Sequence, residues 1–351
     1  MYKPERAFLS VATASAAVAL LAVPSAAGAA TRATADRHAG KSKITIGFVP
    51  SLASDPFFIS MQYGAQQEAN KLGVKLIWQG ASGTYSPSAQ LPYVNSVLAD
   101  KPSAFILVPT DSKALMPSVL KAKSMGIPVL TVDTTVVNTG VLASHITGDN
   151  VGGGALAARL LNKALGGRGQ VFIMTGNPGV TTEQLRIKGF TKELKKFPGI
   201  KNAGFEYTKD QPSLAETEME AVLSRFPHLG GVFAIDDTTA EGVIQALKAE
   251  KKVGKVKLVA YDAEPTEVSA LRAGQMTAVV AQRPAVEGAL AVQYAYDEVT
   301  HHTAPVRHSV IVPDVLLERS TLSTDTKWFY CTSLKACKIT WQPTASNTGG
   351  L

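Results

Sequence analysis

The chain has 351 residues, of which 45% are hydrophobic and 18% are charged, as expected for a globular protein large enough to hold two hydrophobic cores. Its formal charge of +7 is spread along the chain without a basic stripe, which argues against nucleic-acid binding. After residue 30 the sequence has no uninterrupted apolar run long enough to span a bilayer, which argues against an integral membrane protein.

The amino end follows a different pattern from the rest of the chain. Lys3 and Arg6 precede an apolar run over residues 8–23, and Ala27 and Ala29 then stand in an A-x-A arrangement. This is the order of a secretory signal peptide, so we predict a signal peptide at residues 1–29 and a linker at residues 30–43. A membrane anchor is the competing interpretation of the same run. Because no cysteine lies near the cleavage region, we expect a mature protein without a lipid anchor, free in the periplasm or outside the cell.

The stretch ITIGFVPSLASDPFF at residues 44–58 predicts a short buried strand, a polar loop and the start of a helix. In open α/β sheets, ligands meet the chain just past the carboxyl end of such a strand. Ser51 and Asp55 supply hydrogen-bonding groups in this loop, and Pro56 suits the first position of a helix. An amphipathic helix needs one of Phe57 and Phe58 in the core and turns the other toward the loop; the alternative places both in the core.

Short apolar strands alternate with helices along the rest of the chain, which indicates parallel sheets covered on both faces. The predicted strands span residues 44–49, 74–78, 104–109, 128–133, 170–175, 204–207, 231–235, 256–261, 277–282 and 308–313. The predicted helices span residues 56–72, 86–99, 113–125, 151–165, 181–197, 213–226, 236–248 and 284–300.

The strand pattern repeats once, because three strands of the first run recur 126 to 129 positions later and the ends at Asp133 and Asp262 are 129 apart. We therefore predict an α/β fold of two doubly wound parallel-sheet lobes with a cleft between them, lined by strand ends from both. The chain is expected to cross between lobes near residues 145–148, 282–284 and 308–312, forming a multi-crossing hinge that favours closure. The expected segments are 44–147 plus 283–309 for the first lobe, 148–282 plus 310–325 for the second, and a tail at 326–351.

Cys331 and Cys337 are the only cysteines of the chain, and both lie in the predicted tail. In an oxidising compartment we expect a local disulfide between them, with two free thiols as the alternative. Such a bond would pin the tail and has no evident catalytic role.

Several short motifs occur in a fixed order: SLASDPFF, GAQQEANKLG, FILVPTDS, GIPVLTVD, SHITGDNVGGG, RIKGF, GVFAIDD, LVAYDAEP and AVVAQRP. Together they resemble the periplasmic sugar-binding proteins of ABC transporters, of the ribose-binding, type I class, from about residue 44 to residue 313. The resemblance implies a two-lobed binder of the Venus-flytrap kind that encloses a small polar ligand and delivers it to a membrane permease. A sensory protein that presents the same ligand to a membrane receptor is the alternative.

The resemblance also implies a set of ligand-binding residues. An aromatic pair would stack on a sugar ring, loop residues would lie beside it, and polar groups from both lobes would hold the hydroxyl groups. The matching positions are Ser51, Asp55, Phe57, Phe58, Asp133, Arg186, Asp236, Asp262 and Gln282. Alternatives remain open for three of them: Asp133 and Asp262 as helix caps or hinge ion pairs, and Arg186 as a partner of Glu183.

Four departures from the family pattern bear on the ligand. Relatives commonly have asparagine at Asp55 and Asp236 and arginine at Thr134, and the loop at residues 208–213 lacks the usual aromatic residue, for which Tyr207, Trp78 or Tyr85 could substitute. The cleft would then hold four carboxylates and one arginine, and enclosing uncompensated carboxylates is costly. We therefore expect a sugar, a polyol or an amino sugar as the ligand, with one aspartate facing out, or a bound proton or cation, as the alternatives.

Other classes of protein have weaker support. The chain lacks G-x-S-x-G and H-E-x-x-H, so we do not expect an enzyme. Gly152, Gly154 and Ala157 fit G-x-G-x-x-A, but the run opens a helix deep in the chain and favours helix packing over dinucleotide binding. The histidines near residue 301 have no ligand-spaced partners, so neither a metal nor a cofactor is expected. We expect the protein to be a monomer.

Overall fold

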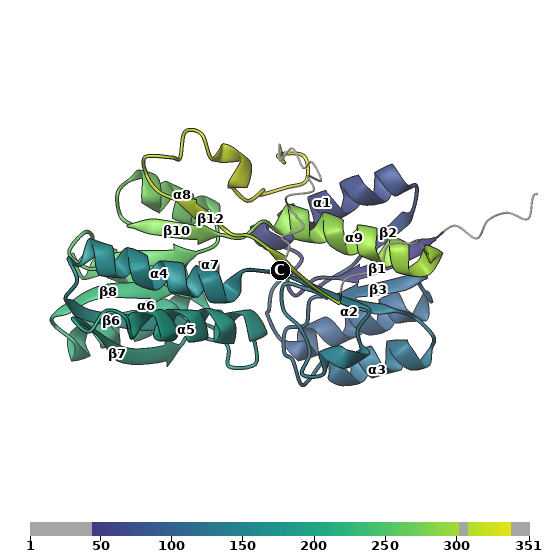
Figure 1. Cartoon of the computed structure of the whole chain (residues 1–351), viewed down its shortest axis with the longest axis horizontal. Coiled ribbons are helices and arrows are strands. Elements are labelled where there is room, and N and C mark those ends of the chain that lie inside the picture. Colours follow the sequence, from purple (N-terminus) through teal and green to yellow (C-terminus); the bar gives the residue numbers. More distant parts are fainter. Residues whose placement is uncertain (1–43, 302–307, 338–351) are drawn as a thin grey trace, which may run out of the picture. The chain divides into compact units, whose positions relative to one another are not determined.

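The computed structural model describes residues 44–301 and 308–337. The predicted signal peptide and linker, and residues 338–351 of the predicted tail, lie outside the described residues. The described residues belong to one compact unit built on two six-stranded sheets (Figure 1). Within those two ranges, no helix combines the length and the apolar character that crossing a bilayer requires.

The first sheet has the strand order β11-β5-β4-β3-β1-β2, and all of its strands are parallel. Its strands are β1 (Thr45–Val49), β2 (Lys75–Trp78), β3 (Ala104–Leu107), β4 (Val129–Val132), β5 (Ser144–Gly148) and β11 (Ser309–Val312). Its helices are α1 (Pro56–Leu72), α2 (Pro87–Ala99), α3 (Met116–Ser124) and α9 (Pro284–Thr300), with a 3₁₀ turn η1 (Thr139–Val141). Helices α1 and α9 pack in one hydrophobic cluster with the first sheet, and helices α2 and α3 pack in another. Helices therefore cover both faces of this sheet.

The second sheet repeats this order as β12-β10-β9-β8-β6-β7, with only its edge strand β12 antiparallel. Its strands are β6 (Gly169–Thr175), β7 (Ile200–Tyr207), β8 (Leu229–Ala234), β9 (Lys257–Tyr261), β10 (Ala278–Ala281) and β12 (Val315–Leu317). Its helices are α4 (Asn150–Ala164), α5 (Thr181–Leu194), α6 (Pro212–Arg225), α7 (Asp237–Ala249) and α8 (Pro265–Arg272), and a 3₁₀ turn η2 (Thr326–Trp328) follows β12. The predicted pair of doubly wound sheets is therefore confirmed. We call each sheet with its helices a lobe.

Local sequence sets the ends of the helices that lead to the strand ends. Helix α1 begins at Pro56 because Asp55 caps it, with its carboxylate accepting a hydrogen bond from the Phe57 N–H at 2.7 Å. The same helix ends at Gly73, whose φ of 68° belongs to the left-handed region that glycine adopts without strain.

Two glycines let paired helices approach closely. A Cβ on Gly154 in α4 would lie 2.0 Å from the carbonyl oxygen of Arg186 in α5, and one on Gly64 in α1 would lie 1.8 Å from that of Ala285 in α9. No side chain fits at either place, so glycine is required for this contact in both lobes. The helix-packing interpretation of the glycine run at residues 152–157 is thus confirmed at Gly154.

Within residues 44–301 and 308–337, the chain passes between the lobes three times: after β5, at residues 282–283 and at residues 313–314. Residues 144–148, for which no strand was predicted, form β5, and the crossing expected near residues 145–148 follows directly after this strand. Residues 310–312 were expected in the second lobe but belong to the first, because β11 pairs with β5. The alternating pattern of residues 308–313 fits the edge strand of either sheet, so only the pairing decides its place.

Candidate functional site

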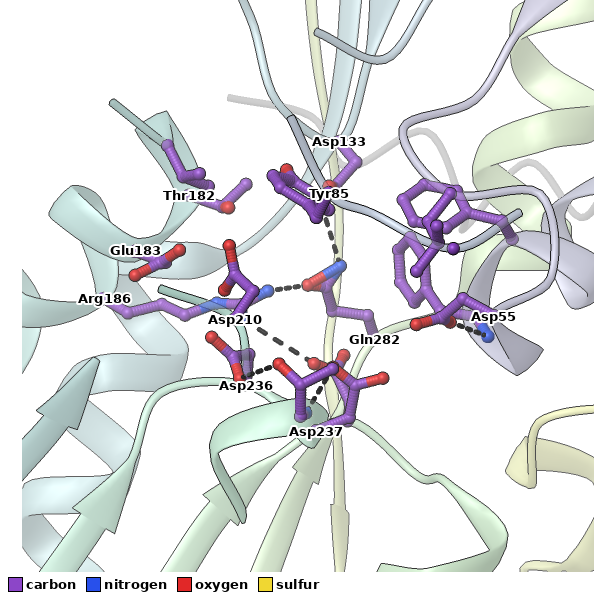
Figure 2. Close-up of a pocket in the computed structure, with 17 residues that line it drawn as sticks. Asp55, Tyr85, Asp133, Thr182, Glu183, Arg186, Asp210, Asp236, Asp237 and Gln282 are labelled. Atoms are coloured by element: carbon purple, nitrogen blue, oxygen red, sulfur yellow. Dashed lines mark hydrogen bonds and ion pairs between the residues drawn. The ribbon is translucent and has the colours of Figure 1, made fainter. Parts of the chain in front are cut away.

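A cavity of about 110 Å³ lies at the carboxyl ends of the central strands and is lined by residues of both lobes (Figure 2). Eight of the nine predicted ligand-binding residues line it. The lining consists of Leu52, Asp55, Phe57, Phe58, Gly83, Tyr85, Asp133, Val180, Thr182, Glu183, Arg186, Asp210, Asp236, Asp237, Thr238, Asp262 and Gln282. The residues that follow strands β4, β8, β9 and β10 are among them, as the topology predicts.

Ser51 is the predicted residue that the cavity does not include. Its side chain is fully buried, and its hydroxyl donates to the carbonyl of Val108 at 2.8 Å. The hydroxyl therefore ties the loop after β1 to the end of β3. The structure places Ser51 beside the cavity and not in its lining, in hydrogen-bond contact with Tyr85, so its role in ligand binding stays a prediction.

Phe57 and Phe58 form the aromatic part of the cavity wall. Their rings meet edge to face, with centroids 5.0 Å apart and an angle of 84° between the planes. Both side chains are at least nine-tenths buried and both line the cavity. One turn of α1 thus contributes to the hydrophobic cluster and offers aromatic surface to a ligand. Of the three aromatic residues considered as further wall, Tyr85 lines the cavity and Trp78 and Tyr207 do not.

A chain of polar contacts joins the lobes through Gln282. Its amide nitrogen donates to the carboxylate of Asp133 at 3.0 Å, and its amide oxygen accepts from the guanidinium of Arg186 (Figure 2). Arg186 also donates to the side chain of Asn150 and to the carbonyl of Ile235, and lies 3.7 Å from the carboxylate of Asp262. The ion pair of Arg186 is therefore made with Asp262 at the end of β9, not with the neighbouring Glu183 on its own helix.

Asp133 and Asp262 occupy equivalent places in the two lobes. Each follows a central strand, and their φ values of 58° and 82° lie in the left-handed region. Each backbone N–H donates to the next strand, to Ile146 in the first lobe and to Val280 in the second. A positive φ is costly for aspartate, so the backbone here is held by its surroundings in a conformation that turns the carboxylate toward the cavity.

The cavity holds more acid than the sequence predicted. Three further carboxylates line it, those of Glu183, Asp210 and Asp237, so that seven carboxylates face one guanidinium. Asp210 lies in the loop at residues 208–213, which lacks the aromatic residue usual in the family, and Asp237 directly follows the predicted Asp236. Among the described residues, Glu183, Asp210 and Asp236 form one group with the spacing of cation ligands, and Asp55, Asp237 and Glu264 form another.

Burial makes ionisation of these acids unfavourable. It raises the pKa of Asp55 and of Asp133 to about 7, and that of Glu183 to about 8. Burial also raises the pKa of Asp262, but only to about 6, because the charge of Arg186 works against it. The cavity thus has several acids that take up protons near neutral pH when no other cation balances their charge.

The tail reaches the site, which the sequence did not predict. The Tyr330 hydroxyl donates to the carboxylate of Asp262 at 3.0 Å, and its ring meets Phe57 at a centroid distance of 5.6 Å. The predicted disulfide between Cys331 and Cys337 is confirmed, and the Cys331 N–H donates to the hydroxyl of Ser60 in α1. The tail therefore contacts both lobes behind the cavity.

Comparisons with known proteins agree with this architecture. A family model described as "Periplasmic binding protein domain" matches residues 46–303. The chain is 30% identical over 264 residues to the ribose import binding protein RbsB of Bacillus subtilis, covering 74% of this chain and 83% of that protein. It is 31% identical to the xylitol-binding protein of Mycolicibacterium smegmatis, covering 66% of this chain and 65% of that protein. A solved solute-binding protein of an ABC transporter from Agrobacterium vitis, bound with alpha-D-tagatopyranose, is 32% identical with a TM-score of 0.79, covering 82% of this chain and all of that one.

Proposed function

Since the chain belongs to the periplasmic binding protein family, we propose that it is an extracytoplasmic solute-binding protein that captures a sugar or polyol and delivers it to an ABC transporter. The observation that carries the proposal is the cavity at the strand ends, where an aromatic pair from one lobe faces hydrogen-bonding groups from both. An aromatic ring suits the apolar face of a sugar, and carboxylate, amide and guanidinium groups suit its hydroxyls.

In this proposal the ligand-binding residues are the eight predicted residues in the cavity wall together with Tyr85. The three crossings between lobes act as a hinge, and closure encloses the solute. The protein performs no chemistry on its ligand and acts as a monomer.

Binding tests this function directly. Calorimetric titration with D-ribose, D-allose, D-tagatose, xylitol and their amino analogues is expected to find at least one ligand that binds at micromolar or lower concentration. Phe58→Ala should weaken that binding by about 30-fold, since it removes roughly 2 kcal/mol of ring contact. Phe205→Ala is the matched control, because Phe205 is an exposed aromatic residue of β7 outside the cavity. Failure of every sugar and polyol to bind the folded protein would overturn the proposal.

We further propose that residues 1–29 direct export and are removed, leaving a mature protein without a lipid anchor. Mass spectrometry of the protein from the native host would show an amino terminus near residue 30. Partition into a detergent phase, or retention of residues 1–29 in a membrane fraction, would contradict this.

A further inference from the structure

The positive charge of Arg186 pairs with only one of the acids in the cavity wall. Arg186 directs its hydrogen bonds to Asn150, Ile235 and Gln282, and its ion pair is with Asp262. Glu183, Asp210 and Asp236 lie on the second lobe: Glu183 in the first turn of α5, Asp210 in the loop between β7 and α6, and Asp236 after β8. We call these three residues the acid triad. Figure 2 shows them gathered on the side of the cavity where Arg186 enters.

Part of the acid triad is already satisfied within the protein. Glu183 accepts from the hydroxyl of Thr175 at 2.6 Å and from the N–H of Asn177 at 3.1 Å. Asp210 accepts from the side chain of Asn177. These contacts fix two of the three carboxylates in place, so the triad is held in position by β6 and the loop that follows it.

The carboxylate of Asp236, the third member of the acid triad, is only partly satisfied by hydrogen bonds within the protein. One oxygen of Asp236 caps α7 by accepting from the N–H of Thr239 at 2.7 Å and also accepts from the hydroxyl of Thr238. Its other oxygen, Oδ2, is buried and receives no hydrogen bond from a hydroxyl, an amide or a basic group; the side chain lies against the carboxyl group of Asp210, which is itself an acid, and the residue is only 9% exposed. A buried carboxylate oxygen without a partner is costly, so this oxygen marks a position for a donor that comes from a ligand.

We propose that the solute is a polyhydroxylated amine, such as an amino sugar, whose ammonium group is bound by Glu183, Asp210 and Asp236. This rests on the proposed function and narrows its ligand. An ammonium group has three N–H donors, and carboxylate oxygens that accept them at about 2.8 Å stand about 4.6 Å apart around a tetrahedral nitrogen. In the acid triad, one oxygen of each residue lies within 4.8 Å of the others.

A divalent metal ion fits these residues less well. Calcium takes six to eight oxygen ligands, and magnesium demands near-ideal octahedral geometry and keeps several waters. In the acid triad, Glu183 and Asp236 already accept hydrogen bonds from hydroxyl and N–H groups of the protein. An ammonium needs only three acceptor oxygens, one from each of the three residues, whereas a metal ion would need further ligands beyond them.

Ionisation provides a readout specific to this proposal. Burial raises the pKa of Glu183 to about 8, and burial together with the charges of Glu183 and Asp236 raises that of Asp210 well above its ordinary value. A cationic ligand stabilises the ionised carboxylates, so its binding must release protons to the solvent near neutral pH. A neutral sugar brings no positive charge, so its binding releases no protons from these acids.

The test compares D-glucosamine, D-galactosamine and D-mannosamine with D-glucose, D-galactose and D-mannose by calorimetric titration in phosphate and Hepes buffers at pH 6 and pH 7. We expect at least one amine to bind about 30-fold more tightly than its neutral partner, with proton release and tighter binding at pH 7. Asp236→Asn keeps the cap of α7, because its side-chain oxygen still accepts from Thr239, and should remove most of the preference for the amine. Asp100→Asn, at an exposed position at the end of α2, is the matched control and should change neither the preference for the amine nor the release of protons.

The outcomes separate this inference from the proposed function. Neutral sugars that bind as tightly as the amines would overturn the amine assignment and leave the sugar-binding function intact. If neither set binds, the amine assignment is overturned, and the titrations with D-ribose, D-allose, D-tagatose and xylitol decide separately whether the sugar-binding function stands. Stabilisation by Ca²⁺ alone that equals the effect of the amine and is lost in Asp236→Asn would assign the triad to a metal ion and also overturn the amine.

Discussion

Replacing Gln282 by methionine tests whether the polar chain between the lobes stabilises the protein. Gln282 is 1% exposed and links Asp133 of the first lobe to Arg186 of the second through its amide. Methionine keeps the length of the side chain and removes both hydrogen bonds. Arg186 is charged and Asp133 is partly ionised near neutral pH, and a hydrogen bond to a charged group typically contributes about 1.5 to 3 kcal/mol. Arg186 retains Asn150, Ile235 and the nearby Asp262, so we take the lower end and expect a loss of about 3 kcal/mol.

This loss should be visible in calorimetry. For a folded part of roughly 290 residues, the entropy of unfolding is about 0.6 kcal/mol/K, so the melting temperature should fall by about 5 °C. Gln67→Met, at an exposed position in α1, is the matched control and should leave it within about 1 °C. A stability change for Gln282→Met no larger than that of the control would refute the reasoning, because it would mean that the bridge between lobes contributes no net stability.

Three further predictions concern stability. Because burial raises the pKa of Asp55 and Asp133 to about 7, the folded state binds more protons than the unfolded state between pH 4 and pH 7. The melting temperature of the ligand-free protein should therefore fall as pH rises through this range. A rise in melting temperature would contradict the assignment of these two residues as buried acids. Replacing Cys331 and Cys337 together by serine should cost up to roughly 2 kcal/mol, measured by urea denaturation, since the bond closes only a short loop; no loss would show that the tail is held by its packing alone. Gly154→Ala should lower the free energy of unfolding by about 1 to 3 kcal/mol, because its new Cβ forces α4 away from α5. Gly140→Ala should be near neutral, because a Cβ at this position lies 3.3 Å from its nearest neighbour, the side-chain oxygen of Asn138. Equal effects of the two substitutions would refute the close-packing argument.

The parts of the site that the sequence predicts are those fixed by strand ends. Asp133 and Asp262 directly follow apolar strands 129 residues apart, and parallel strands bring such positions to one edge of a sheet. The helix start at Pro56 likewise fixes Phe57 and Phe58 relative to the same edge. Period, strand polarity and capping are local properties, so the pattern of residues is enough to recover them.

The parts that the sequence could not predict depend on loop conformation and tertiary pairing. Asp210 reaches the cavity because Lys209 and Asp210 both have positive φ values, and nothing in the loop TKDQPS indicates this. Ser51 has the right chemistry in the right loop, yet its side chain lies beside the cavity and not in its lining. Tyr330 reaches Asp262 only because the tail folds back over both lobes, a contact between residues 68 positions apart.

The acid content of the cavity links ligand charge to closure. Moving the lobes together withdraws carboxylates from water, and the raised pKa of Asp55 in one lobe comes mainly from burial and in part from Asp262 in the other. Without a cation, closure must be accompanied by proton uptake, so the closed state is favoured at low pH. A ligand can shift the equilibrium between the open and closed states only by the difference between its affinities for these two states. An ammonium group binds the closed state much more tightly, because closure brings the carboxylates together around it. A neutral sugar must instead close the lobes against the repulsion of the acids.

We therefore expect small-angle X-ray scattering to show that an amine-bearing ligand compacts the protein at pH 7.5, where a neutral analogue at equal saturation compacts it less. Equal compaction by both would mean that the charge of the cavity does not control closure.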